Sequence, residues 1–448
     1  MPYFIIFLEF EWDGFIVVET TGPITFADYM HTCLSHPQLG YYMNPAHHVI
    51  GSKGDFITSP EISQVFGELL AVWLLSQWLT SGMSREVRLV ELGPGRGTLM
   101  HDVLRVFSQF PQARNAVKDV HLVETSRAMR TKQESKLTNI TQKNGWRLHW
   151  HDELIEIKPD ANKFTLLVAH EFFDALPFRL FQKSERDWRE VLIDVGPDPS
   201  EPVILRPGDN TSKPTLDFSP LTQQPRLRQV VSHPLLEASV LCNSSTRFPK
   251  LPIGSRIEVS PASFSVARRI GELLHVNGLN SAWDSTAGSA LIVDYGDDKV
   301  YGNSFRAFRN HKLADVFHRP GECDLTVNVD FAYLREATED LVSSHGPITQ
   351  SAFLERMGIK QRVAALAAST QDDKRRNDIE NAAKRLVDPT GMGTQYKVMA
   401  LTGKPLGRMD DAERWPFLDL DPPAASSAAA AAASQPRGGG ASAATVRL

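Results

Sequence analysis

The chain has 448 residues, with 48 lysines and arginines against 53 aspartates and glutamates, so its formal net charge is −5. A composition of 42% hydrophobic and 23% charged residues excludes a mostly disordered chain, and the length predicts about two or three domains. The slight acidity argues against broad nucleic-acid binding, which requires a basic surface, and leaves room for an acidic pocket that attracts a cation. Cys33, Cys242 and Cys323 lie far apart, so we expect no metal site, no disulfide framework and a reducing compartment.

Residues 1–21 form an atypical N-terminal segment. Met1–Thr20 contains four acidic residues and no lysine or arginine, whereas a mitochondrial presequence is rich in arginine and a signal peptide begins with basic residues. We interpret the segment as an extra strand or a misplaced start rather than a targeting signal. No apolar run approaches the ~20 residues that a spanning helix needs, so we expect no stable membrane insertion.

Residues 22–84 are predicted to form a helical N-terminal subdomain. Apolar residues at helical spacing after Thr25 predict a first helix with Thr25 as its N-cap. Ser59-Pro60 predicts the start of a second helix, Glu61–Trp78. Between them lies the glycine-containing loop Gly40–Pro60.

Strands and helices alternate from residue 87 onward, which predicts an α/β fold with a doubly wound, Rossmann-like sheet over residues 85–402. The expected strands are Arg88–Leu92, Val120–Val123, Trp146–Trp150, Thr165–His170, Trp188–Val195, Arg256–Val259, Ala290–Asp294 and Tyr396–Leu401. The expected helices are Thr98–Phe110, Ser126–Lys136, Pro261–Val276, Phe331–Val342 and Ser351–Ala368.

Three polar or biased ranges complete the expected organisation. A proline-rich range of about 196–252 is interpreted as a surface insertion into the sheet domain. Residues 403–421 form a C-terminal extension. Residues 422–448 are rich in alanine, serine and glycine without a core-forming face, so we predict a disordered tail.

The sharpest local signal is a glycine-rich turn between a predicted strand and a predicted helix. Gly93, Gly95 and Gly97 occupy this turn, where glycine lets the backbone approach a ligand closely. A dinucleotide fingerprint would have its third glycine at position 98, which is Thr98, and Pro94 removes an N–H that a pyrophosphate would need. The turn therefore favours a nucleoside ligand without a pyrophosphate over NAD.

Three acids accompany these strands. Glu124 follows the second strand, where a carboxylate can accept hydrogen bonds from both hydroxyls of a ribose; the alternative is a solvated loop acid. Asp152 ends the third strand in the same way and could meet an adenine amino group. Glu91, inside the first strand, could hold the amino group of a methionine moiety or be an ordinary edge residue.

A second motif, residues 170–177 with the sequence HEFFDALP, follows the fourth strand. Glu171 and Asp174 flank two phenylalanines, and carboxylates beside aromatic faces suit a cationic or planar group. The alternative is that these acids cap a helix that begins near Phe172.

Together these signals resemble the class I S-adenosyl-L-methionine (SAM) methyltransferases, and more closely the MidA-like family of mitochondrial protein arginine methyltransferases that assist respiratory complex I assembly. The resemblance covers roughly residues 22–402. The segments that carry it are 22–30, 40–42, 54–68, 93–97, 170–177, 293–296 and 320–331. Two features depart from the family: no presequence is visible, and the alanine-rich tail is not part of the pattern.

The resemblance implies SAM as methyl donor, a location in the mitochondrial matrix, and symmetric dimethylation of an arginine in a core subunit of complex I. A guanidinium stays protonated, so carboxylates must orient it and guide the loss of a proton. Glu171 is the first candidate for this role, followed by Asp174 and Asp294. The sequence does not predict the oligomeric state.

Residues of the N-terminal loop would close over SAM or the substrate and exclude water. The candidates are Asp55, Thr58 and Ser59, followed by Glu61. Two other classes stay open: a non-catalytic assembly chaperone that keeps a SAM-binding fold, and an NAD-dependent oxidoreductase, which Pro94 and Thr98 disfavour.

Overall fold

The structure is a computed structural model that describes residues 22–43, 58–83, 85–196, 203–204, 226–275, 287–309, 311–404 and 414–418. The predictions for residues 1–21, for Asp55 and for the tail 422–448 fall outside the described residues. Among the described helices, none has the length and apolar character to cross a bilayer.

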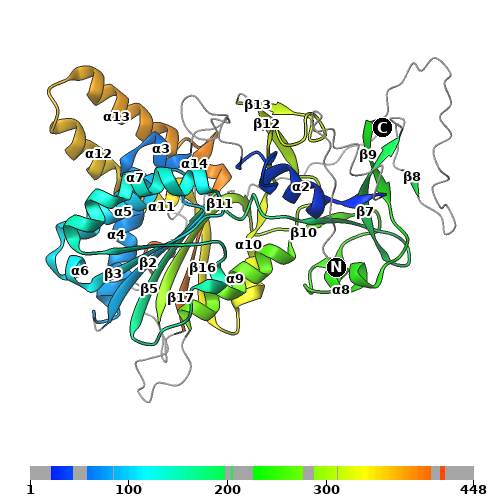
Figure 1. The fold of residues 1–448 in the computed structure, drawn as a ribbon, viewed down its shortest axis with the longest axis horizontal. Coiled ribbons are helices and arrows are strands. Elements are labelled where there is room, and N and C mark those ends of the chain that lie inside the picture. The colour runs from blue at the N-terminus through cyan, green and yellow to red at the C-terminus, as the bar shows by residue number, and fades with distance from the viewer. Residues whose placement is uncertain are drawn as a thin grey trace, which may run out of the picture.

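A central sheet carries the fold, with its strands in the order β16-β17-β11-β5-β2-β3-β4 (Figure 1). Its parallel strands are β2 (Glu86–Leu92), β3 (Val117–Val123), β4 (Arg147–His151), β5 (Lys163–His170) and β11 (Gly288–Asp297). The antiparallel strands β17 (Tyr396–Gly403) and β16 (Val342–Thr349) form one edge, and β15 (Val329–Asp330) adds to β11. The predicted doubly wound α/β sheet is confirmed.

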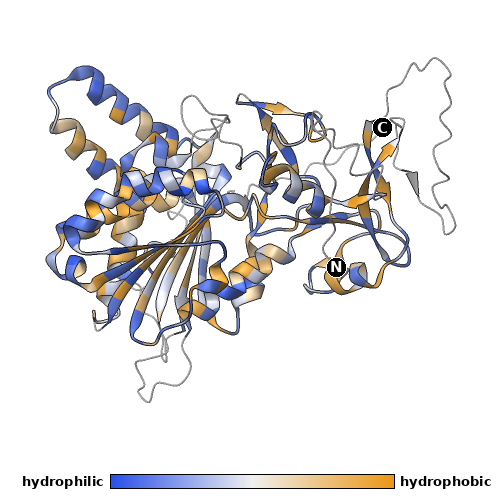
Figure 2. Ribbon diagram, in the orientation of Figure 1, coloured by the Kyte–Doolittle hydropathy of each residue, from blue (hydrophilic) through white to orange (hydrophobic). Residues whose placement is uncertain are grey.

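Helices cover both faces of this sheet, which explains why both faces of its inner strands carry buried apolar side chains. In β5, Val168 packs into the cluster beneath α4 (Gln64–Thr80) and α5 (Thr98–Gln109). Its neighbour Leu167 points the other way, toward α9 (Pro261–Leu274) and α10 (Phe331–Thr338). Figure 2 shows these strands as mostly hydrophobic ribbons between partly hydrophilic helices.

A second, mainly antiparallel sheet lies beside the first, in the order β10-β6-β7-β9-β8 with β1 paired to β7. Its strands are β1 (Ile24–Thr25), β6 (Arg179–Lys183), β7 (Trp188–Gly196), β8 (Val203–Ile204), β9 (Arg226–Val231) and β10 (Arg256–Val259). A small third sheet contains β12 (Arg306–Arg309), β13 (Lys312–Ala314) and β14 (Asp324–Thr326). Next to it packs the predicted first helix, α2 (Phe26–Ser35), whose N-cap Thr25 accepts the Asp28 N–H.

The range 196–252 is not simply a surface insertion. Within it, β9 pairs with β7 and buries Val230 completely. The helix α8 (Leu236–Cys242) buries Ala238 and Cys242 in the same cluster as Phe181. This described part of the range therefore belongs to the core of the second sheet.

Several predicted helices are divided or displaced. Glu61–Trp78 is two helices, α3 (Ser59–Ile62), with Thr58 rather than Ser59 as N-cap, and α4. Ser63 separates them in an extended conformation and caps α4 by accepting the Val65 N–H. Gly358, at φ +92°, divides Ser351–Ala368 into α11 (Gln350–Arg356) and α12 (Ile359–Ala368). The other helices are α6 (Pro111–Ala116), α7 (Arg127–Asn144), α13 (Asp373–Leu386), α14 (Met392–Gln395), η1 (Leu154–Glu156) and η2 (Phe248–Lys250).

Candidate active site

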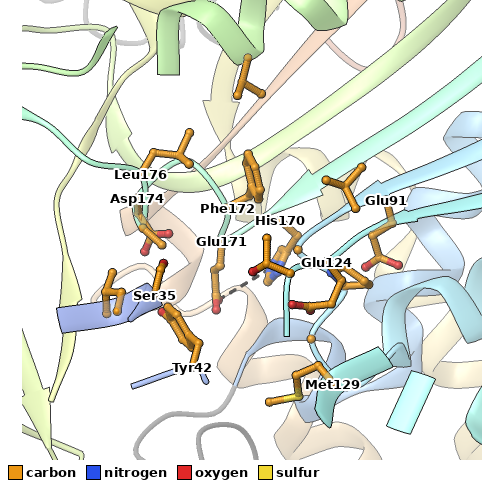
Figure 3. A pocket seen from close by; sticks show the side chains of 18 of the residues that line it. Ser35, Tyr42, Glu91, Glu124, Met129, His170, Glu171, Phe172, Asp174 and Leu176 are labelled. Carbon is orange, nitrogen blue, oxygen red and sulfur yellow. Dashed lines mark ion pairs between the residues drawn. The ribbon is translucent and has the colours of Figure 1, made fainter. Parts of the chain in front are cut away.

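A cavity of about 630 Å³ opens at the carboxyl edge of the central sheet (Figure 3). The strand order reverses there, because the chain runs from β2 outward to β3 and β4 and then returns to β5 on the other side of β2. Ligands of open α/β sheets bind at such a switch point. The glycine-rich turn follows β2 and the HEFFDALP turn follows β5, so the two motifs predicted from the sequence meet across this cavity.

The glycine-rich turn requires glycine for backbone reasons. Gly93, Gly95 and Gly97 have φ of +60°, +49° and +76°, in the left-handed region that side chains disfavour. A Cβ at Gly93 would also lie 3.0 Å from the Phe172 ring of the opposite turn. The backbone of the glycine-rich turn therefore lines the cavity without side chains, and at Gly93 it lies against the turn that carries Phe172.

Glu124 faces the cavity and is held in place by α7. Its Oε1 accepts the Ser126 N–H at 2.8 Å and its Oε2 accepts the Gln133 amide at 3.1 Å. Gln133 also donates to the Gly95 carbonyl at 2.8 Å and accepts the Trp150 indole N–H at 2.9 Å. Glu124 is thus anchored beside the glycine turn rather than solvated in a loop. Sequence analysis missed Gln133, although its position between Met129 and Leu137 on the buried face of α7 is a signal.

Glu91 is a central-strand residue, 3% exposed, so its interpretation as an edge residue is wrong. Burial raises the pKa of Glu91 to about 8, against a hydrogen bond from the Met100 backbone. Its Oε2 has no hydrogen-bond partner within the described residues. Since the residue lines the cavity, this oxygen fits the cationic amino group of a ligand such as SAM.

Of the remaining predicted cofactor residues within the described part of the chain, Asp152 and Thr58 line the cavity and Ser59 does not. Asp152 lines the cavity while pairing with Arg130 at 2.5 Å. Thr58 also lines it, next to Glu61, which accepts the Thr98 hydroxyl of the glycine turn's helix. The structure does not place Ser59 there: it is fully buried and its hydroxyl donates to Gln350 Oε1 at 3.2 Å.

The other end of the cavity is formed by the turn that carries Glu171. Residues 171–176 form no helix, so neither Glu171 nor Asp174 caps a helix beginning near Phe172. Glu171 has φ +50°, its N–H donates to the Val293 carbonyl at 3.0 Å, and its Oε1 accepts the Tyr396 hydroxyl. Burial raises the pKa of Glu171 to about 8, the Tyr396 hydrogen bond opposes this rise, and nearby carboxylates add to it.

Asp294 is fully buried beneath this turn and is not among the residues that line the cavity. Its Oδ2 accepts three consecutive backbone N–H groups, from Phe172 at 3.2 Å, Phe173 at 2.9 Å and Asp174 at 3.4 Å. Burial and the neighbouring carboxylates raise its pKa. This geometry makes Asp294 a support for the turn, in place of the substrate contact expected from the sequence.

Asp174 completes an acidic end of the cavity together with Asp324 of β14. Asp174 accepts the Thr326 hydroxyl at 2.7 Å, and Asp324 accepts the Tyr42 hydroxyl at 2.6 Å. Figure 3 shows Glu171, Asp174 and Tyr42 on one side of the cavity, and Glu91 and Glu124 on the other. Within the part of the chain that the structure describes, no group of acids, histidines or cysteines is arranged to hold a metal ion.

Sequence analysis missed several residues at this end because they come from distant elements. They are Tyr42, Tyr295, Asp324 and Tyr396, all lining the cavity. Tyr295 lies under the Arg306 guanidinium at 5.5 Å. Tyr42, Tyr295 and Asp324 fall in the segments 40–42, 293–296 and 320–331, which entered only as family features. Nothing in the local pattern distinguishes the three tyrosines from core residues.

Comparisons with known proteins identify the family of the chain. Residues 69–348 match a family described as "Putative S-adenosyl-L-methionine-dependent methyltransferase". The mitochondrial protein arginine methyltransferase NDUFAF7 of Danio rerio is 38% identical, over 85% of this chain and 84% of the relative. Its Homo sapiens counterpart is 36% identical, over 86% and 81% respectively.

A solved structure gives the same fold. A "likely methyl transferase" of Burkholderia thailandensis, bound to S-adenosyl-homocysteine, superposes with a TM-score of 0.64 at 22% identity, covering 89% of this chain and 92% of that one. These findings confirm the expected class I methyltransferase fold, SAM as cofactor, and a mitochondrial member of the expected family. The chain belongs to the family of SAM-dependent methyltransferases that includes the mitochondrial protein arginine methyltransferases.

Proposed function

We propose that the chain methylates an arginine of a protein substrate in the mitochondrial matrix, with SAM as methyl donor. The observation that carries this proposal is the acidic end of the cavity, where Glu171, Asp174 and Asp324 converge across the cavity from the glycine turn. The names of the relatives, which are protein arginine methyltransferases, support it.

An arginine side chain suits this end because its charge persists when it is buried. A guanidinium stays protonated at any pH below about 12, and it presents several N–H donors in one plane to carboxylate acceptors. Its planar face can also pack against the ring of Phe172, which lines the same space. Three carboxyl groups in a poorly solvated cavity repel one another, and a bound cation relieves that repulsion.

The opposite end would hold SAM through residues of β2, β3 and β4. Glu91 would pair with the amino group, and the backbone of 93–97 would approach the ligand closely. Glu124 would accept hydrogen bonds from the ribose hydroxyls, since each of its oxygens keeps a free lone pair beside the bonds already described. Asp152 would meet the adenine amino group.

Glu171 would orient the guanidinium and receive a proton. When a guanidinium nitrogen gains a methyl group, its bond to one hydrogen must break, and that proton needs an acceptor. An ionised Glu171 within reach supplies the acceptor, and Asp174 offers a second carboxylate on the same turn. The methyl group itself comes from the sulfonium of SAM.

The finer assignment follows from the family resemblance seen in the sequence. We propose a core subunit of respiratory complex I as substrate, symmetric dimethylarginine as product, and a role in complex I assembly. A non-catalytic, SAM-binding assembly chaperone is the alternative. Mass spectrometry of arginine methylation in complex I, with and without the protein, would distinguish them: unchanged methylation with failed assembly would favour the chaperone.

The catalytic assignment is tested by Glu171→Gln, which keeps the size of the side chain and removes its charge. We expect near-normal SAM affinity and melting temperature, with single-turnover methylation reduced about 100-fold or more. Glu322→Gln is the matched control, because Glu322 is an exposed acid paired with Arg309 and Arg319 away from the cavity. Full turnover by Glu171→Gln would remove Glu171 from the mechanism.

A further inference from the structure

The closing strand of the central sheet brings a tyrosine into contact with Glu171. Tyr396 begins β17, is buried, and lies opposite Tyr295 of β11 in the antiparallel register. Its hydroxyl donates to Oε1 of Glu171, a residue 225 positions away in the sequence. No property of the HEFFDALP motif itself indicates this contact.

The direction of the Tyr396 hydroxyl is fixed by the packing of its ring. The ring is parallel to the His170 imidazole, 9° between planes at a centroid distance of 6.0 Å, and its centroid lies 4.0 Å from that of Tyr295. Glu171 is held from the other direction by the hydrogen bond from its N–H to Val293. Two hydrogen bonds therefore hold Glu171, one at its backbone N–H and one at Oε1 of its side chain.

We propose that Tyr396 is a positioning residue for methyl transfer, whose hydroxyl holds Oε1 of Glu171 so that Oε2 faces the substrate guanidinium. This inference rests on the role proposed for Glu171. Without the Tyr396 hydroxyl, both oxygens of the Glu171 carboxylate could accept hydrogen bonds from the guanidinium. With it, only Oε2 is free, and its orientation is defined. Orientation within a fraction of an ångström has large effects on transfer rates.

The Tyr396 hydroxyl also favours the ionised form of Glu171, whereas the other surroundings of Glu171 favour its neutral form. Burial raises the pKa of Glu171, and Asp174 on the same turn and Asp324 of β14 raise it further. Asp294 of β11 lies beneath the turn, Tyr295 lies beside Tyr396, and His170 Nε2 of β5 is 3.8 Å from Oε1. Burial lowers the pKa of His170 to about 3, so this imidazole supplies no charge to help. Among these neighbours, Tyr396 is the one that donates a hydrogen bond to the carboxylate.

Tyr396→Phe removes the hydroxyl alone. We expect unchanged SAM affinity, a turnover rate about 10-fold lower at neutral pH, and a pH–rate profile whose ascending limb moves to higher pH. The limb moves upward because loss of a hydrogen bond to the charged form raises the pKa of Glu171. Tyr333→Phe is the matched control: it removes another buried tyrosine hydroxyl, which is bonded to Ser244 at 2.8 Å, and neither residue lines the cavity. This variant should leave the ascending limb in place.

Site-specific 3-fluorotyrosine at position 396 tests the same idea with the ring preserved. Its more acidic hydroxyl is a stronger donor, so the limb should move to lower pH. In the background of Glu171→Gln, Tyr396→Phe should add little further loss, since both changes act on one carboxylate. The inference about Tyr396 is wrong if Glu171→Gln is inactive while both Tyr396 replacements leave the ascending limb of the pH–rate profile unmoved. It is also wrong if the losses of turnover in Glu171→Gln and Tyr396→Phe are additive in the double variant. If Glu171→Gln is fully active, the proposed function of Glu171 fails instead.

Discussion

The carboxylate of Asp294 accepts the backbone N–H of Phe173 at 2.9 Å, which fastens the turn after β5 to the end of β11. Because β5 and β11 are parallel neighbours in the sheet, this hydrogen bond connects their carboxyl ends at the edge where the cavity opens. A side chain buried beneath the site thus determines where the cavity-lining carboxylate of Glu171 lies.

Replacing Asp294 tests this support. Asp294→Ala leaves four backbone N–H groups without their acceptor, three on the turn and that of Tyr295, each worth about 1–3 kcal/mol, so the melting temperature and the turnover should both fall. Asp294→Asn keeps one acceptor oxygen and should retain most of the stability. Thermal melts and single-turnover rates on both variants would check this. A stable but inactive Asp294→Ala would instead indicate a direct catalytic role.

The glycine turn should tolerate no branched side chain at Gly95. Gly95→Val places a β-branched residue at φ +49°, where the strain is about 1–2 kcal/mol, and puts bulk where the backbone must approach SAM. SAM affinity, measured by calorimetry, should collapse while the fold persists. Gly82→Val is the control, since Gly82 has φ +85° with open space around it, on the turn after α4. Equal losses of affinity in both variants would show that strain alone is responsible.

Glu124→Ala should weaken SAM binding by about 1.5–3 kcal/mol, roughly 10- to 150-fold, through lost hydrogen bonds to a charged acceptor. The change also frees the Gln133 amide, which then holds the Gly95 carbonyl alone. Glu134→Ala, an exposed neighbour on α7, is the control. Unchanged affinity in Glu124→Ala would mean that the ribose is held elsewhere.

SAM binding should release a proton from Glu91. With a pKa of about 8, Glu91 is mostly neutral at pH 7, and an ammonium group placed against it would favour its ionised form. Affinity should therefore rise with pH up to about 8. Calorimetry in two buffers of different ionisation enthalpy should show the release, and Glu91→Gln should abolish it. An identical buffer dependence in Glu91→Gln would assign the proton to another group.

The same shift predicts how the ligand-free chain responds to pH. A carboxyl group whose pKa rises on folding contributes stability below its unfolded value, near 4.5, and loses that contribution as pH approaches 8. Glu91→Gln should therefore flatten the decline of melting temperature between these two pH values. A decline as steep as that of the unchanged protein would show that other buried acids dominate.

Three of the residues that sequence analysis identified share one property: they directly follow a parallel strand. Gly93, Glu124 and Glu171 each come at such a position, and the carboxyl ends of parallel strands meet at one edge. A local pattern of apolar strand followed by polar turn is therefore enough to bring them together, although their sequence separation is large.

Other residues depend on packing that no local pattern reports. Gln133 lies within a helix, and Tyr396 begins an antiparallel strand, yet both contact the site through side chains. The division at Ser63 was missed because apolar residues continue on both sides of it, so periodicity alone predicts one helix. The pairing of β9 with β7 was missed because the polar, proline-rich sequence before it resembles a loop.

The position of β17 has a consequence for biosynthesis. This strand pairs on both sides, with β11 and with β16, and it carries Tyr396 into the cavity. A ribosome releases residue 396 only after the glycine turn, the acidic turn and both other sheets have emerged. The nascent chain therefore lacks part of the cavity lining during synthesis, and a chain cut before β17 should be inactive. A truncation at residue 395 should lose both cooperative melting and methyl transfer, and retained activity would show that the closing strand is dispensable.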